Sequence, residues 1–256
     1  MAEVETSLAE SVLTITLNRP ESYNAFTTSM HAALRAALEE AAAEDVRAVV
    51  VTGAGKGFCA GQDIGEFRGL EHDVGEHLEA TYHPNVRAIR ALEKPVIAAV
   101  NGAAAGAGLS LACVCDYRIA ADTAAFVPGF VGIGLVPDSG GSYFLARLLG
   151  PSRAFAWMSS NRKLTAAEAH AWGLVDEVVE ADVLAARAAE VAADYAARPT
   201  QGIGMTKRLF DHAQTATLDE QLALEGELQT AATKTADFAE GVDAFLEKRP
   251  PNFSGR

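Results

Sequence analysis

The strongest constraint on the fold comes from two segments rich in glycine and alanine, each directly after an apolar run. The segments read GKGFCAGQDI (55–64) and NGAAAGAGLSLA (101–112). The runs before them, 46–53 and 95–100, have the composition of buried strands. Small residues after a strand let a ligand approach main-chain N–H groups, and a helix that begins there adds positive potential. The pattern predicts two loops that could bind one oxygen atom between them.

Strands and helices alternate along the first half of the chain. Besides the two strands above, the expected elements are strands at 11–18 and 117–120 and helices at 27–43 and 77–92. Thr27 or Thr28 is the candidate N-cap of the first helix. A further short helix is expected after the second glycine-rich segment. This alternation predicts an α/β fold with a largely parallel sheet flanked by helices.

Helical periodicity dominates after Pro151. The segment LTAAEAHAWGLVDEVV predicts helix, turn and short strand, and longer helical runs span 182–197 and 218–246. Pro199 separates two of these helices. We expect one core over residues 1–195. The helical C-terminal region, residues 196–256, is expected to pack on that core or on a neighbouring subunit.

Composition limits the partners and the compartment. The chain of 256 residues has 34 acidic and 21 basic side chains and a net charge of −13, which disfavours nucleic acid and anionic membranes. The three cysteines favour a reducing, cytoplasmic setting, and the N-terminus lacks a secretion signal. The uncharged stretch 95–115 is interrupted by Asn101 and glycines, so we expect a buried strand, turn and helix rather than a membrane span.

Common phosphate-loop and hydrolase motifs do not fit the glycine-rich segments. Lys56 is followed by Gly57, which excludes a Walker loop, and the second segment lacks the third glycine of a dinucleotide fingerprint. Ser110 lacks the flanking glycines of a nucleophile elbow. The histidines lack zinc-helix spacing, so no metal is expected. Three of them lie in a charged helical region and are expected to be solvated: His72, His77 and His83.

A single acid stands out downstream. The segment GLVPDSGG (134–141) places Asp138 on a tight turn before an apolar helical run. One interpretation is a proton-transferring carboxylate, whose pKa an apolar pocket would raise. The other is the N-cap of the following helix, which would lower that pKa.

Taken together, the segments NRPESYNAF, GFCAGQDI, NGAAAGAGLSLACVCDYRIA and LVPDSGG resemble, in order and spacing, the enoyl-CoA hydratase/isomerase (crotonase) superfamily. The resemblance extends from Ser11 to Phe253. It implies a crotonase-like core of repeated strand, strand and helix units in a spiral, with a helical C-terminal trimerisation region. It also implies an acyl-CoA thioester substrate, no separate cofactor, and a homotrimer or hexamer.

The resemblance assigns roles by position. The amides of Gln62 and Ala107 would form an oxyanion hole, in which one donor is typically worth about 3 kcal/mol in the barrier. Family members commonly carry glycine at the second position, and alanine retains the N–H. The further acyl-CoA contacts that the resemblance implies are Ala25, Ala60, Asp63, Ile64, Ser110, Lys248 and Phe253. The last two often come from a neighbouring subunit. A lysine that many members carry after the Asp63-Ile64 pair is replaced by Gly65 and Glu66.

Two differences from the family's hydratases decide between hydration and isomerisation. Hydratases of the family carry one glutamate at the position of Ser110 and another at the position of Gly129, so both carboxylates are absent here. Water addition needs groups that orient and deprotonate water, and serine and glycine cannot do this efficiently. Asp138 instead matches an acid of double-bond isomerases, and its segment is similar to that of phenylacetate-pathway ring isomerases. Four further side chains would line the acyl pocket or merely fill the core: Ser110, Tyr143, Phe130 and Phe67.

The sequence therefore predicts an acyl-CoA isomerase of fatty acid or phenylacetate catabolism, with Asp138 as the proton shuttle. It would convert a 3-enoyl-CoA to a 2-enoyl-CoA or isomerise a phenylacetate-type ring. One alternative is a weak hydratase or a thioester hydrolase that uses Glu66 or Asp116. Another is an acyl-CoA-binding protein without turnover, in which Asp138 is only a cap.

Overall fold

Six strands form the main sheet of the computed structural model, which describes residues 2–68 and 73–256. In spatial order they are β1 (Val4–Ala9), β2 (Val12–Leu17), β3 (Ala48–Gly53), β5 (Val96–Val100), β7 (Tyr117–Ala121) and β10 (Glu177–Val179). Strands β1 and β2 form an antiparallel hairpin, and every other pair is parallel. The expected parallel sheet is confirmed, while β1 is an additional edge strand.

A second, smaller sheet follows from the same part of the chain. Its strands are β4 (Gly57–Cys59), β6 (Ala103–Ala105), β8 (Ala125–Val127) and β9 (Leu164–Thr165), in that spatial order. The first three are parallel, and each comes a few residues after β3, β5 or β7 of the main sheet. The chain thus runs strand, strand, helix three times, which is the repeat that the resemblance implies.

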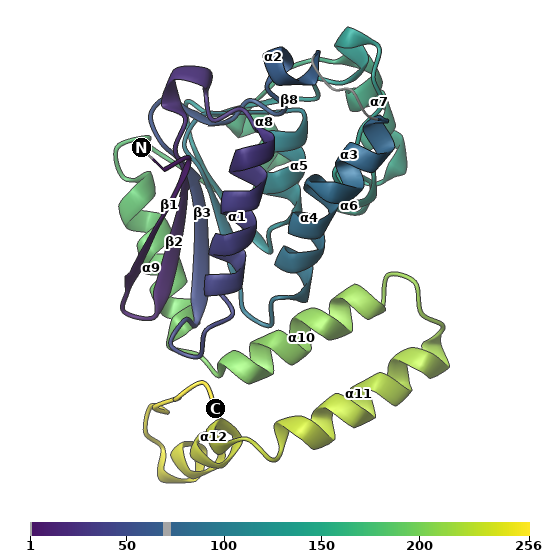
Figure 1. Ribbon diagram of the computed structural model, residues 1–256. Helices are drawn as coiled ribbons and strands as arrows, with labels where there is room; N and C mark the ends of the chain where they lie inside the picture. Colours follow the sequence, from purple (N-terminus) through teal and green to yellow (C-terminus); the bar gives the residue numbers. More distant parts are fainter. Residues whose placement is uncertain (1, 69–72) are drawn as a thin grey trace.

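Helices surround the two sheets (Figure 1). They are α1 (Thr28–Glu40), α2 (Ile64–Phe67), α3 (Val74–Ala80), α4 (Tyr82–Ala91), α5 (Ala107–Val114), α6 (Gly141–Leu149), α7 (Pro151–Ser160), α8 (Ala166–Ala171), α9 (Leu184–Ala196), α10 (Thr200–His212), α11 (Leu218–Ala232) and α12 (Ala236–Glu247). Two short 3-10 turns span Pro20–Ser22 and Val131–Ile133. Helix α9 packs on β2, β3, β5 and β7, whereas α1 contacts β1, β2 and α4. As expected, Thr27 caps α1, since its side chain accepts a hydrogen bond from the Met30 N–H.

Two helices expected to be continuous are broken. The run 77–92 is divided into α3 and α4, because the Pro84 ring would clash with the carbonyl of residue 80 in one continuous helix. The run 218–246 is divided into α11 and α12. There the Thr235 side chain accepts from the Phe238 N–H and starts a new helix.

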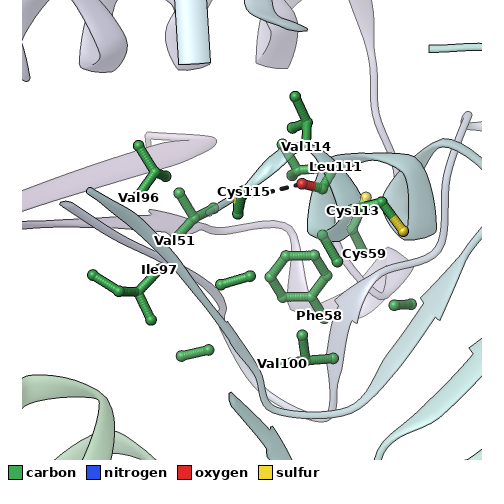
Figure 2. Close-up of a cluster of buried hydrophobic side chains, with 14 of the residues drawn as sticks. Val51, Phe58, Cys59, Val96, Ile97, Val100, Leu111, Cys113, Val114 and Cys115 are labelled. Carbon is green, nitrogen blue, oxygen red and sulfur yellow. Dashed lines mark hydrogen bonds between the residues drawn. The ribbon is translucent and has the colours of Figure 1, made fainter. Parts of the chain in front are cut away.

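The core between the sheets and α5 is built from small and branched side chains around Phe58 (Figure 2). Phe58 is fully buried, and the thiol of Cys115 donates to the carbonyl of Leu111. All three cysteines are buried and free. Burial raises the pKa of each thiol to about 12, so they are inert, neutral core residues.

The C-terminal helices lie at the opposite end of the molecule from α2 (Figure 1). Helix α10 begins directly after Pro199. Arg47, which precedes β3, ties the chain end to the core by donating to the carbonyl of Phe253 at 3.0 Å and to Thr200 Oγ1 at 3.0 Å. The expected division at residue 195 falls one residue before the end of α9 and stays a prediction. Within residues 2–68 and 73–256, every helix is too short or too polar to cross a bilayer.

Candidate active site

Three parallel strands end at one cavity of about 100 Å³. The loops after β4, β6 and β8 all line it, because the carboxyl ends of neighbouring parallel strands meet at the same edge of a sheet. Its lining from these loops is Ala60, Gly61, Gln62, Ala105, Gly106, Ala107, Gly129 and Phe130. The remaining walls come from α2, α3, α4 and the turn that holds Asp138. Each repeat of the fold therefore contributes one loop to the cavity.

A short parallel bridge with Phe26 sets the direction of the main-chain N–H of Gln62, a residue that lines this cavity. The Phe26 N–H donates to the Gly61 carbonyl at 2.7 Å, and the Asp63 N–H donates to the Phe26 carbonyl at 2.9 Å. In such a bridge, the groups of the residue in between point to the other side. The Gln62 N–H consequently points away from Phe26, toward the loop after β6.

Ala107, the first residue of α5, presents a second main-chain N–H at the cavity wall. The first N–H groups of a helix have no acceptor within it, so the Ala107 amide is available to a ligand. Gly61, at φ 88°, allows the two loops to touch: a Cβ there would lie 2.8 Å from the Ala105 carbonyl oxygen and 3.3 Å from the Ala107 nitrogen. Only glycine allows this close approach, so the loop that leads into Gln62 lies directly against the start of α5.

Asp138 completes the cavity wall from the third repeat. Its main-chain carbonyl accepts hydrogen bonds from the Gly141 N–H at 2.7 Å and from Ser110 Oγ at 3.0 Å. Its carboxylate accepts from Ser139 Oγ at 2.9 Å. Burial raises the pKa of Asp138 above its ordinary value, although the Ser139 bond and the nearby charge of His83 act in the opposite direction. The result is a carboxylate suited to accepting a proton.

The interpretation of Asp138 as a helix cap is wrong. Ser139, at φ 51°, and Gly140, at φ 81°, are both left-handed, so α6 begins at Gly141. The N-cap is Gly140, and no side chain caps this helix end. The Asp138 side chain is thereby left on the cavity wall.

The positions that carry glutamate in hydratases supply no carboxylate. Ser110 is buried beneath the Asp138 turn, and its Oγ lies within hydrogen-bond distance of the Gly106 and Asp138 carbonyls. Gly129 lines the cavity, and its N–H donates to Asn161 Oδ1 at 2.9 Å. Among the described residues, Asp138 is the single acid that lines the cavity.

The two other candidate acids are engaged elsewhere. The Glu66 carboxylate accepts from the N–H and the hydroxyl of Thr28, at the start of α1. Asp116 lies at the opposite end of the main sheet, where it accepts from the Val96 N–H at 2.9 Å and pairs with Arg90 and Lys207. Neither lines the cavity.

Comparison with known proteins assigns the chain to a family. Residues 7–256 match the family described as Enoyl-CoA hydratase/isomerase. The chain belongs to the enoyl-CoA hydratase/isomerase family. It is 45% identical over 252 residues to 1,2-epoxyphenylacetyl-CoA isomerase of Escherichia coli K12, covering 96% of each chain. It is 35% identical over 257 residues to 2,3-dehydroadipyl-CoA hydratase of the same organism, covering all of both.

Solved structures agree with this membership. An enoyl-CoA hydratase from Bacillus anthracis superposes with a TM-score of 0.94 at 31% identity, over 99% of this chain and 100% of that one. An enoyl-CoA hydratase from Mycobacterium smegmatis gives a TM-score of 0.93 at 33% identity, over 99% of each chain. The expected crotonase-like fold is confirmed. Enoyl-CoA hydratase/isomerase family members act on acyl-CoA thioesters, and isomerases and hydratases both occur among the relatives.

In this enoyl-CoA hydratase/isomerase, only some expected acyl-CoA contacts lie at the cavity. Ala60 and Ile64 line it, whereas the Asp63 carboxylate caps α2 and pairs with Arg19 at 3.1 Å. The hydrogen bond from Arg19 holds the pKa of Asp63 below its usual range. Arg19 also donates to the carbonyl of buried Ala25 at 2.6 Å, so Ala25 and Asp63 are linked through this guanidinium.

The C-terminal pair lies elsewhere in the same chain. Lys248 is the C-cap of α12, and the Phe253 ring packs near Gly241. The Phe253 carbonyl is held by Arg47 at the amino end of β3, whereas the cavity lies beyond its carboxyl end. Within one chain, Lys248 and Phe253 therefore do not reach the cavity.

Sequence reasoning missed two aromatic side chains of the cavity wall. Tyr82, at the start of α4, is buried, and its hydroxyl donates to Gln62 Oε1. His77 of α3 was expected to be solvated, yet it lines the cavity and its Nε2 is buried without a partner among the described residues. His83 is half-exposed and pairs with Glu79 at 2.9 Å, and the expectation for His72 lies outside the described residues. Phe67 and Phe130 line the cavity as expected, and Tyr143 does not.

Proposed function

We propose that this enzyme is an acyl-CoA isomerase that moves a double bond, with Asp138 as the proton shuttle. The supporting observation is the placement of one half-buried carboxylate, that of Asp138, on the wall of a cavity that Gln62 and Ala107 also line. The family membership supplies the thioester substrate. No second carboxylate lines the cavity among the described residues to assist water addition.

In the proposed reaction, the thioester carbonyl lies between the two amides. The Asp138 carboxylate removes a proton from C2 of a 3-enoyl-CoA, and the electron pair moves onto the carbonyl oxygen as a dienolate. The amides stabilise this charge, typically by about 3 kcal/mol for one donor. The same carboxyl group returns the proton to C4, which leaves the double bond between C2 and C3.

The chemical identity of the substrate's acyl group is a separate part of this proposal. The similarity to 1,2-epoxyphenylacetyl-CoA isomerase supports a ring-derived acyl group. The cavity is mainly apolar, with walls from Phe67, Leu78, Phe130 and Leu135. The buried Nε2 of His77 is the polar exception on the side of α3 and could donate to or accept from an oxygen of such a ring. We therefore include ring isomerisation beside the shift in a linear 3-enoyl-CoA.

The proposed assembly is a homotrimer or hexamer in which Lys248 and Phe253 reach the substrate of a neighbouring subunit. Their distance from the cavity of their own chain supports this arrangement. Exposed apolar side chains on α12 also support it, since Phe245 is 83% and Leu246 is 71% exposed. Light scattering would give the mass, and a monomer that isomerises at the full rate would contradict it. A cytoplasmic location and the absence of a separate cofactor stay predictions.

Solvent deuterium exchange followed by NMR tests the isomerase. With a 3-enoyl-CoA, the wild type should incorporate deuterium at C2 or C4 and shift the double bond, and Asp138→Asn should abolish both. The matched control Asp182→Asn alters an exposed acid and should retain both. Hydrated product as the main outcome would favour the hydratase. Thioester binding without exchange, unaffected by Asp138→Asn, would favour the non-catalytic binder.

A further inference from the structure

Tyr82 makes a hydrogen bond that reaches the proposed oxyanion hole indirectly. Its hydroxyl donates to the side-chain Oε1 of Gln62, the residue whose main-chain N–H faces the cavity. The reaction proposed above uses only the backbone N–H of Gln62, so it does not account for this side-chain contact. Tyr82 comes from α4, which begins twenty residues later in the chain.

Every polar atom of the Gln62 side-chain amide makes a hydrogen bond. Its Nε2 donates to the Phe26 carbonyl at 3.2 Å and to the Asp63 carbonyl at 3.3 Å, while Oε1 accepts from Tyr82. The amide thus uses both donors and its acceptor. The side chain links the bridge at Phe26 to α4, and the main chain between them carries the N–H of the hole.

Tyr82 is itself rigidly placed. It is 5% exposed, and its ring meets Phe26 edge-on with centroids 5.7 Å apart. His31 of α1 lies 3.9 Å from Tyr82 between centroids and stacks on Phe26 at 4.4 Å. Burial raises the pKa of Tyr82 far above its ordinary value, so the phenol stays protonated and remains a donor.

We propose that Tyr82 is a positioning residue, which fixes the Gln62 main-chain amide in the oxyanion hole through the Gln62 side chain. Preorganised donors stabilise developing charge without reorganisation during the reaction, and small displacements weaken them. Loss of the Tyr82 hydroxyl would free Gln62 Oε1 and allow the loop after β4 to shift. This inference rests on the proposed function, because it assumes that a thioester carbonyl binds at Gln62 and Ala107.

The test uses Tyr82→Phe, which keeps the ring and removes only the hydroxyl. The infrared stretch of ¹³C-carbonyl hexanoyl-CoA, a saturated thioester that cannot isomerise, should move to lower frequency on binding to the wild type. Tyr82→Phe should lose at least half of that shift, and kcat for 3-hexenoyl-CoA should fall about tenfold with KM unchanged. Tyr117→Phe, a matched change on β7, should behave as the wild type.

A double-mutant cycle separates positioning from direct contact with the substrate. Gln62→Ala keeps the main-chain N–H and removes the side chain, so it should reproduce the loss seen in Tyr82→Phe. In that background, Tyr82→Phe should have no further effect. A full additional loss would overturn the inference, and so would an unchanged carbonyl shift in both single variants. If the wild type itself shows no carbonyl shift, the oxyanion hole and the proposed function fail instead.

Discussion

The hydroxyl of Ser110 donates to the main-chain carbonyl of Asp138 across 3.0 Å and joins α5 to the turn that carries the acid. The position of a hydratase glutamate is thus occupied by a residue that supports a different carboxylate. The fit is close, since a Cβ at Gly141 would lie only 2.6 Å from Ser110 Oγ. A longer side chain at residue 110 would displace the Asp138 turn.

Ser110→Ala should loosen this turn. We expect a loss of about 1 kcal/mol in the free energy of unfolding, the usual value of one hydrogen bond. We also expect kcat to fall roughly fivefold with KM unchanged, since Asp138 is less well placed. Denaturant titration and isomerase kinetics check this. Ser160→Ala removes a comparable hydrogen bond, to the Trp157 carbonyl, and should leave kcat unchanged. Equal effects of the two variants on kcat would refute a positioning role for Ser110.

Gly129→Glu should fail to create a hydratase. Gly129 has φ 78°, and a Cβ there would lie 3.0 Å from the Gly106 nitrogen. The strain should cost about 1–3 kcal/mol, and the displaced Gly106 would disturb the start of α5 and lower isomerase activity. Gly173→Ala is the matched control, because its φ is 79° and a Cβ there meets nothing within 4 Å. It should show the stability loss alone. Efficient water addition by Gly129→Glu would show that the loop adapts.

The pH dependence of kcat/KM should report Asp138. In the proposed mechanism the ionised carboxylate is the base. Burial raises the pKa of Asp138, so the acidic limb should lie above pH 3.8, the ordinary value. Activity is therefore lost as pH falls through the raised pKa. Ser139→Ala removes a hydrogen bond that lowers this pKa, so the limb should move to higher pH. A limb that stays in place in Ser139→Ala would mean that another group titrates.

Asp116→Asn should affect stability rather than chemistry. Asp116 pairs with buried Lys207 at 2.8 Å, and breaking a buried pair by removing one partner costs about 3 kcal/mol. Isomerase activity per folded molecule should be unchanged. Asp194→Asn, which breaks an exposed pair with Arg198, should cost less than about 1 kcal/mol. Loss of activity in a fully folded Asp116→Asn enzyme would restore Asp116 as a candidate acid.

The local signals explain which features the sequence could predict. Strand β3 and the Thr27 cap follow from apolar composition and from a hydroxyl before a helical run. Pro84 is a local signal for the break between α3 and α4. The helical spacing of apolar residues continues across the proline, however, and predicted one helix. Strands β4, β6 and β8 have three residues each, too few for alternation to show.

The site was predictable where it depends on the main chain of nearby residues. Glycine-rich segments after strands indicated two loops that meet, and the family resemblance assigned the Gln62 and Ala107 amides within them, which stays a prediction. The pairing of Tyr82 with Gln62 depends on how α4 packs on the loop after β4, which no local pattern records. Asp138 was open to two interpretations, because the left-handed conformation at Ser139 that excludes capping has no clear mark in the sequence.

The origin of the two proposed amide donors, Gln62 and Ala107, has an evolutionary consequence. They belong to the backbone of the first two repeats, so most side-chain substitutions there leave them in place, as alanine at residue 107 illustrates. The proposed proton-transferring acid, Asp138, is a side chain of the third repeat and can be lost or moved by a single substitution. If the proposed mechanism holds, enolate stabilisation is therefore the trait that this scaffold retains. The fate of the enolate is the trait free to diverge.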